Sequence, residues 1–360
     1  MRGFLRPTAG LTCLFAMAVT GCSSGSGGTS DAAPAPSQRN SASPSETDGS
    51  GTSGASGTTD TTGASGASST SYAPYVSATE AAETDDAGSP STYNLAFVIS
   101  GGSSCTPKWN GTAAIGSSAV KSRVSKLKQD GASVRVSFGG ASGKELATTC
   151  SSASKLAAAY GAALDAAGST QADFDIEGDT LADSRSVALR SEAIAQLQKE
   201  RPDLEVSFTL PVMPSGLDSD GLTLLESANK YDVQVSTVNI MTMNYGESYD
   251  GDMGGYAVTS AKATHTQLKR VFGLSDAGAW GGMALTSMLG VNDVAGETFT
   301  LSDAADVRGF AEEKGITWVS MWSTFRDVQC EQGESTRDDA ATNCSGVTQS
   351  SGAFGEAFAG

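Results

Sequence analysis

Histidine and positive charge are both scarce in this 360-residue sequence. It contains one histidine, His265, and 23 lysines and arginines against 40 aspartates and glutamates, so its formal charge is −17. One histidine cannot build a histidine-rich zinc site. A serine–histidine–aspartate hydrolase would have to use this residue without any G-x-S-x-G motif. The acidity argues against a nucleic-acid partner and against charge-driven binding to an anionic membrane, and it favours solubility outside the cell.

The apolar run near the N-terminus, LTCLFAMAV at residues 11–19, is too short to span a bilayer as a mature helix. It follows Arg2 and Arg6, as in a secretion signal, and leads into VTGC, which resembles a bacterial lipobox ending at Cys22. We therefore predict a signal peptide over residues 1–21 and lipidation of Cys22, so that acyl chains alone anchor the protein to the outer face of a bacterial cell membrane. An ordinary signal peptide would leave the protein secreted and unanchored.

Cysteine is also sparse, with six residues, of which one lies in the predicted signal and one is Cys22. Cys105, Cys150, Cys330 and Cys344 remain, an even number in an oxidising compartment. We favour the two local pairs, Cys105–Cys150 and Cys330–Cys344, and other pairings stay open. No C-x-x-C pattern suggests zinc, and we predict neither a metal nor a cofactor.

Residues 22–71 lack aromatic side chains and consist mostly of Ser, Gly, Thr, Ala and Pro. Such a composition cannot bury enough apolar area to offset the entropy of the chain. We predict a flexible tether here, followed by one domain over residues 72–360.

Eight strand-like runs follow, with helical patterns or loops between them. The strands are expected at residues 72–78, 93–100, 133–140, 172–177, 205–211, 237–245, 282–289 and 317–323, and helices at 119–131, 153–168, 185–200 and 301–315. Alternating strands and helices imply a parallel sheet, and eight units favour a closed (β/α)8 TIM barrel of the α/β class over an open sheet. Neither a dinucleotide fingerprint nor a P-loop motif is present.

The stretch TQADFDIEGD places Asp173, Asp175 and Glu177 at alternate positions, with Phe174 and Ile176 between them. On a strand the three carboxylates would share one face, and we expect that face to point into the barrel while the apolar pair packs against outer helices. We place Glu177 as the last residue of the fourth strand. A carboxyl at the barrel rim with another acid below it has a raised pKa and can act as a general acid.

At this point the sequence resembles glycoside hydrolase family 18. DFDIE resembles the core of the family signature D-x-x-D-x-D-x-E, and three further segments follow the family order: SFGG at residues 137–140, MTMNYG at 241–246 and MWSTFRD at 321–327. The resemblance implies retaining hydrolysis of β-1,4-linked N-acetylglucosamine polymers, as in chitinases, with the 2-acetamido group of the sugar as nucleophile.

The resemblance also implies a role for each matching residue. Glu177 would protonate the glycosidic oxygen and then activate water, and Asp175 would orient the acetamido group. Asp173 would hydrogen-bond beneath Asp175, and Trp322 would stack on the sugar. The residues expected to contact substrate are Asp173, Ser137, Met241, Met243, Asn244, Tyr245 and Trp322.

The sequence departs from the family pattern at two positions. Thr170 stands where the signature has its first aspartate. Because a hydroxyl cannot share a proton with Asp173, we expect the pKa values of the three inward acids, called here the acid stack, to differ from those in the family. Met243 stands where the family has a tyrosine, and Tyr245 is a candidate to supply the missing hydroxyl. The segment GVNDVAGE, residues 290–297, follows the seventh expected strand and could line the cleft through Asn292 or Asp293, although we favour a capped loop. We interpret Asp218 as a turn residue.

Two other functions stay open. The protein could be an endo-β-N-acetylglucosaminidase acting on other glycans, because the mechanism needs only an acetamido group at the cleaved sugar. It could also be a carbohydrate-binding barrel without catalysis. In each case we expect a monomer whose partner is chitin or another oligosaccharide that contains N-acetylglucosamine.

Overall fold

The computed structural model describes residues 70–331 and 343–360. The predicted signal peptide, the lipidation at Cys22 and nearly all of the predicted tether lie outside the described residues. Within the described part of the chain, no helix is both long and apolar enough to cross a membrane.

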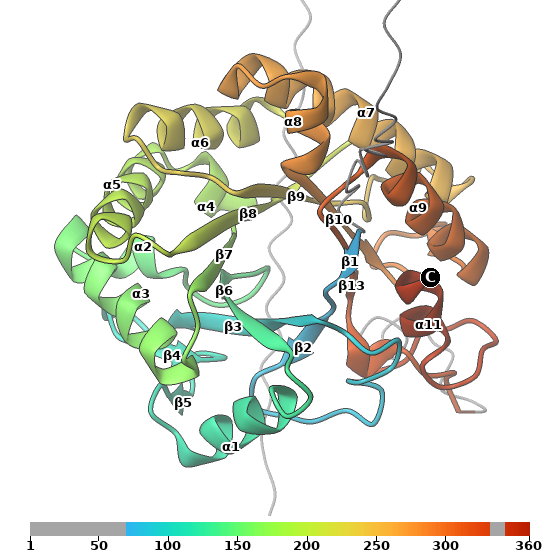
Figure 1. Ribbon diagram of the computed structural model, residues 1–360, viewed down its shortest axis with the longest axis horizontal. Coiled ribbons are helices and arrows are strands. Elements are labelled where there is room, and N and C mark those ends of the chain that lie inside the picture. Colours follow the sequence, from blue (N-terminus) through green and yellow to red (C-terminus); the bar gives the residue numbers. More distant parts are fainter. Residues whose placement is uncertain (1–69, 332–342) are drawn as a thin grey trace, which may run out of the picture. The chain divides into compact units, whose positions relative to one another are not determined.

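A closed barrel of eight parallel strand positions forms the centre of the domain, as predicted (Figure 1). The first position is interrupted: β1 (Ser71–Tyr72) pairs with the last strand and β2 (Tyr75–Ser77) pairs with β3, which closes the ring. The other positions are β3 (Thr92–Ser100), β6 (Ser133–Gly139), β7 (Gln171–Asp175), β8 (Glu205–Pro211), β9 (Thr237–Met241), β10 (Met283–Met288) and β13 (Trp318–Trp322).

Helices surround the barrel on its outer side (Figure 1). They are α1 (Ser118–Leu127), α2 (Leu146–Thr149), α3 (Ala153–Ala167), α4 (Gly178–Ala182), α5 (Ser184–Glu200), α6 (Ser219–Lys230), α7 (Met253–Phe272), α8 (Asp276–Gly281), α9 (Leu301–Lys314), η1 (Thr324–Arg326) and α11 (Ala353–Ala359). Two short antiparallel elements lie outside the barrel: β4 (Pro107–Trp109) with β5 (Ala113–Ala114), and β11 (Gly290–Val291) with β12 (Thr298–Phe299).

The apolar residues that alternate with the acids along β7 point outward and pack against neighbouring strands and helices. Phe174 lies between neighbouring strands, with its ring centroid 5.3 Å from Phe138 and 5.8 Å from Phe208. Tyr160 of the alanine-rich helix α3 covers it at 5.0 Å, and Phe174 is fully buried. Burying one such side chain contributes about 1.5–3 kcal/mol, which fixes the register that turns the alternate carboxylates inward.

The barrel interior is polar, whereas branched apolar residues usually fill such barrels. At the lower end Arg135 lies over the ring of Trp318 at 3.8 Å and donates a hydrogen bond to Asn94 Oδ1 at 2.7 Å. One inward position further along β6 is Ser137, which is paired in register with Asp173 of β7. The barrel interior therefore holds the buried cation of Arg135 at its lower end and the acid stack, which begins at Asp173, above it.

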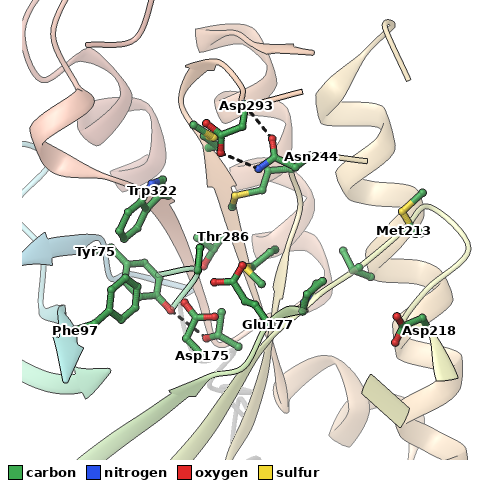
Figure 2. A pocket seen from close by; sticks show the side chains of 17 residues that line it. Tyr75, Phe97, Asp175, Glu177, Met213, Asp218, Asn244, Thr286, Asp293 and Trp322 are labelled. Atoms are coloured by element: carbon green, nitrogen blue, oxygen red, sulfur yellow. Dashed lines mark hydrogen bonds between the residues drawn. The ribbon is translucent and has the colours of Figure 1, made fainter. Parts of the chain in front are cut away.

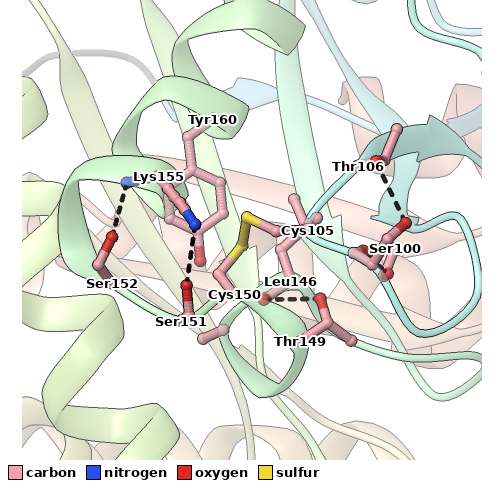
Figure 3. The surroundings of a disulfide bond; sticks show 12 residues. Ser100, Cys105, Thr106, Leu146, Thr149, Cys150, Ser151, Ser152, Lys155 and Tyr160 are labelled. Atoms are coloured by element: carbon pink, nitrogen blue, oxygen red, sulfur yellow. Dashed lines mark hydrogen bonds between the residues drawn. A yellow bond between two sulfur atoms is a disulfide. The ribbon is translucent and has the colours of Figure 1, made fainter.

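Two disulfides link loops outside the barrel, and they are the local pairs favoured by the sequence. Cys105 and Cys150 join the segment before β4 to the end of α2, with Cα atoms 4.5 Å apart (Figure 3). Cys330 and Cys344 have Cα atoms 5.1 Å apart. Both bonds suit an oxidising compartment.

Candidate active site

A cavity of about 300 Å³ opens where the parallel strands end at their carboxyl termini (Figure 2). In (β/α)8 barrels this end of the strands carries the active site. The cavity is the size of a small-molecule site. Asp175 and Glu177 form part of its lining, with aromatic residues to one side of Glu177 and methionines and loop residues around the rest.

Asp175 is the last residue of β7, and Glu177 lies two residues beyond the strand at the start of α4. The prediction that the strand runs to Glu177 is therefore wrong by two residues. The alternation continues nevertheless, because Glu177 keeps an extended backbone and the Ile176 amide donates to the Thr209 carbonyl at 3.0 Å. Gly178, with φ +53°, then turns the chain into the helix.

Burial and neighbouring charge raise the pKa of both carboxyls. Desolvation has the largest effect on the pKa of Asp175, followed by the negative charges of Glu177 and Asp173. Desolvation also raises the pKa of Glu177, which a hydrogen bond with Asp175 lowers in part and the charge of Asp293 raises further. The two residues therefore hold a proton between them at a pH where isolated carboxyls have lost theirs.

Asp173 lies beneath this pair and accepts four hydrogen bonds from hydroxyl groups. Tyr75 and Ser137 donate to Oδ2 at 3.0 and 2.6 Å, and Ser207 and Thr209 donate to Oδ1 at 2.8 and 2.7 Å. Asp173 and Ser137 are fully enclosed and do not line the cavity. Their position corrects the prediction that they contact substrate: they support Asp175 from below.

Thr170 does not belong to the acid stack. It is exposed, it precedes β7, and its carbonyl accepts the Glu205 amide at 2.9 Å. The expectation that a hydroxyl at this position retunes Asp173 is therefore wrong.

Three aromatic residues form one wall of the cavity. Trp322, the last residue of β13, faces the cavity as predicted and stacks on Phe97 with ring centroids 5.4 Å apart. Tyr75 meets the edge of Trp322 at 5.8 Å. Phe97 was not among the predicted site residues. It lies where the register between β3 and β6 shifts, and such a bulge re-aims a side chain.

The end of β9 and the segment after it carry three of the predicted site residues into the cavity, namely Met241, Met243 and Asn244. Tyr245 does not follow them. Asn244 has φ +55°, which breaks the strand alternation, so Tyr245 turns away and is buried between Tyr249 and Tyr256. Its hydroxyl accepts a hydrogen bond from Ser260 at 3.4 Å. The prediction that Tyr245 replaces the missing family hydroxyl is therefore wrong.

Two loop aspartates belong to the cavity: Asp293, which the sequence offered as the less favoured alternative to a capped loop, and Asp218, for which the sequence indicated only a turn. Asp293 accepts a hydrogen bond from Asn244 Nδ2 at 3.2 Å, and its amide donates to Asn244 Oδ1 at 3.1 Å. Asp218 caps α6 by accepting the Gly221 amide at 2.8 Å, and it also lines the cavity. Both loops are brought together by the barrel, and spacing along the chain carries no signal for that.

The chemistry available at this site is proton transfer beside a flat aromatic surface. A carboxyl pair with raised pKa values can donate and accept a proton at one position. The faces of Trp322 and Phe97 suit the apolar face of a ring-shaped ligand. Within the described residues, no group of three or more His, Cys, Asp or Glu side chains could hold a metal ion.

No family model matches the chain. Among curated proteins, one match is a probable bifunctional chitinase/lysozyme of Escherichia coli strain K12. The two sequences are 34% identical over 250 residues, and this match covers 66% of this chain and 28% of that protein. It is 33% identical over 250 residues to endochitinase 11 of Metarhizium anisopliae, covering 66% of this chain and 47% of that protein. The match thus spans less than half the length of either relative.

Among solved structures, the chain resembles the catalytic domain of a hyperthermophilic chitinase from Pyrococcus furiosus. The sequences are 30% identical, and the match covers 81% of this chain and 94% of that domain, with a TM-score of 0.71. The match therefore extends over nearly the whole of that catalytic domain.

Proposed function

This chain belongs to glycoside hydrolase family 18, and from that premise we propose that it hydrolyses β-1,4-linked N-acetylglucosamine polymers with retention of configuration. One observation carries the proposal: Asp175 and Glu177 share a hydrogen bond on the cavity lining, where burial raises the pKa of both carboxyls.

In the first step Glu177 transfers its proton to the glycosidic oxygen. The bond between that oxygen and C1 breaks, and its electron pair stays with the leaving sugar. The acetamido carbonyl oxygen bonds to C1 from the other face, and the amide becomes positively charged. The Asp175 carboxylate accepts a hydrogen bond from the acetamido N–H and stabilises this charge.

In the second step water attacks C1 and the bond to the acetamido oxygen breaks. Glu177 accepts the proton of the water, which restores its starting state. Two inversions at C1 leave the configuration unchanged. The closeness of Asp175 and Glu177 supports this route, since an inverting pair needs carboxyls roughly 6.5–9.5 Å apart to hold a water between them.

Hydrolysis of chitooligosaccharides followed by proton NMR tests the proposal. We expect the first product formed to be the β-anomer, which then mutarotates. An α-anomer formed first would contradict acetamido participation. Binding of the oligosaccharide without any product would favour the alternative of a carbohydrate-binding barrel.

A second candidate activity is endo-β-N-acetylglucosaminidase action on other glycans, because one relative is named a chitinase/lysozyme. The same two carboxyls would serve it. Incubation with glycoprotein glycans and with peptidoglycan separates the two activities by their products.

We also propose that the protein works outside the cell, anchored through a lipid on Cys22. The two disulfides support an oxidising compartment. Substitution of Cys22 by Ala should release the protein from membranes, and unchanged membrane association would contradict the anchor.

A further inference from the structure

Arg135 is a buried cation inside the barrel that has no carboxylate in contact with it. It is only 7% exposed, yet none of the ion pairs in the described part of the chain includes it. The buried Arg190 of α5, by contrast, pairs with Glu145 at 2.8 Å. The ring of Trp318 and the Oδ1 atom of Asn94 contact the guanidinium of Arg135, but both groups are uncharged. Because burying an unbalanced charge is costly, a negative charge elsewhere in the barrel has to offset it.

Asp173 provides this negative charge. It is buried, and its two carboxyl oxygens accept hydrogen bonds from four hydroxyl groups, as an ionised carboxylate does. Arg135 lies two residues before Ser137 on β6, and Ser137 is the register partner of Asp173, so both charged side chains belong to the inward face. Burial lowers the pKa of Arg135, and the charge of Asp173 has the largest effect in the opposite direction.

Tyr75 and Glu205 are the other titratable residues in the described part of the chain whose charges act on Arg135. Burial raises the pKa of the Tyr75 hydroxyl well above its usual value, so this group is neutral. Glu205 is exposed at the start of β8. Asp173 is therefore the buried anion that Arg135 faces. The titratable groups above Asp173 are Asp175, Glu177 and, from the loop after β10, Asp293.

We propose that Arg135 balances the charge of Asp173 and thereby sets the pH range in which Asp175 and Glu177 hold one proton between them. Without this cation the two carboxyls would lie above an unbalanced anion, and they would release their protons only at higher pH. Arg135 does not line the cavity, so it is a positioning residue that acts through the acid stack. The inference rests on the proposed function, because proton transfer by Asp175 and Glu177 is the step that it tunes.

The pH dependence of kcat/KM on chitooligosaccharides, measured with the full chain, tests the proposal. Activity should rise with pH when the first of the two carboxyls ionises, and it should fall when the remaining proton is lost. Arg135 lies four residues before Gly139, the register partner of Asp175, a separation of roughly 13 Å along the strand. Replacing Arg135 by Met should therefore shift both limbs of the profile upward by about half to one pH unit.

Two further variants separate charge from packing. Arg135→Lys keeps the positive charge and should restore the limbs of the wild-type profile, even where its poorer fit lowers stability. Asn94→Asp leaves Arg135 in place but puts a carboxylate where its hydrogen bond is now accepted at 2.7 Å. It should shift both limbs upward, as Arg135→Met does, and it carries the test alone if Arg135→Met does not fold.

The control is Arg201→Met, which removes one positive charge at the end of α5, where Arg201 pairs with Asp165 at 2.8 Å. Exposed charges are largely screened, so both limbs should stay in place. An upward shift in Arg201→Met as large as that in Arg135→Met would mean that net charge is responsible, and it would overturn the inference. A profile that stays in place or shifts downward in Asn94→Asp or in folded Arg135→Met would overturn it as well.

These results leave the proposed function intact, because the wild-type protein still hydrolyses the substrate. A wild-type protein that cleaves no chitooligosaccharide would overturn the proposed function instead. The charge balance is then tested without turnover, by an infrared titration of the protonated carboxyls. Arg135→Met and Asn94→Asp should shift this titration upward by the same half to one pH unit or so, and Arg201→Met should not. An unshifted titration in the first two variants would overturn the inference.

Discussion

The carboxyl groups of Asp175 and Glu177 share a hydrogen bond at the end of β7, although each would carry a negative charge in water. A hydrogen bond between two carboxyls requires a proton on one of them. Burial keeps that proton bound, and the cavity gives it a path to a ligand. The pair therefore holds a proton that it can transfer to a ligand. Glu177 is half-buried, whereas Asp175 is buried.

Replacing Glu177 by Gln should abolish this proton transfer. We expect kcat on chitooligosaccharides to fall by about 10²–10⁴, the usual range for loss of a general acid and base. The side chain of Glu177 does not cap α4, so stability and oligosaccharide binding should change little. Glu226→Gln, at an exposed position of α6, is the matched control and should keep wild-type kcat. Equal kcat in both variants would refute the assignment.

Replacing Asp175 by Asn should increase stability at neutral pH while activity is lost. Because the pKa of Asp175 is raised in the folded state, the folded protein binds this proton more tightly than the unfolded chain does. Its ionisation therefore costs folding free energy as pH rises above the unfolded value of about 3.9. An asparagine remains neutral, and each kcal/mol of cost removed should raise Tm by about 2–4 °C.

Thermal unfolding at pH 7 and pH 3 checks this expectation. The gain in Tm should be present at pH 7 and absent at pH 3, where Asp175 is protonated in both states. Asp130→Asn, at an exposed position, should show no such pH-dependent gain. A gain of equal size at both pH values would mean that packing, and not ionisation, is responsible.

Trp322→Ala should weaken the aromatic wall and lower kcat/KM for chitooligosaccharides about 10–100-fold, equivalent to about 1.4–2.8 kcal/mol. The indole provides a flat face to the cavity and holds Phe97 in place at 5.4 Å. Trp280→Ala is the control, because Trp280 is also half-buried but stacks on His265 at 3.9 Å, away from the cavity lining. That variant should lose stability and retain kcat/KM, and an equal fall in both variants would contradict the role of Trp322.

The two disulfides should differ in their effect on stability. In the chain-entropy model, a closure of 45 residues, as between Cys105 and Cys150, contributes about 4 kcal/mol, and a closure of 14 residues, as between Cys330 and Cys344, about 3 kcal/mol. Urea unfolding of the two double serine variants measures the difference. A larger loss from the shorter closure would show that local strain or contacts outweigh chain entropy.

Local alternation and order along the chain were enough to predict the barrel, the eight strand positions and the inward carboxylates of β7. The inward orientation of these carboxylates depends on which face of β7 each side chain occupies, and the apolar side chains Phe174 and Ile176 determine that face. Glu177 was placed correctly even though the strand ends earlier, because the extended backbone continues through Ile176.

The remaining site residues depend on geometry that adjacent sequence does not contain. Phe97 lies in a shift of register between β3 and β6, and Tyr75 reaches the wall only because the first strand is interrupted. Asp218 and Asp293 come from loops that meet at the cavity after the barrel has closed. The position of Asp293 after a barrel strand made it a candidate for the cleft, whereas the sequence around Asp218 indicated only a turn.

Tyr245 gives the sharpest test of structure against sequence. The sequence pattern made its hydroxyl a candidate for contacting the acetamido group, whereas the left-handed conformation of Asn244 turns it into the core beside Ser260. Tyr245→Phe should therefore keep kcat/KM within about twofold and lose at most about 1 kcal/mol of stability. Met243→Ala, which changes the cavity lining itself, should lower kcat/KM instead. A large loss of activity in Tyr245→Phe with normal stability would mean that this hydroxyl reaches the substrate after all.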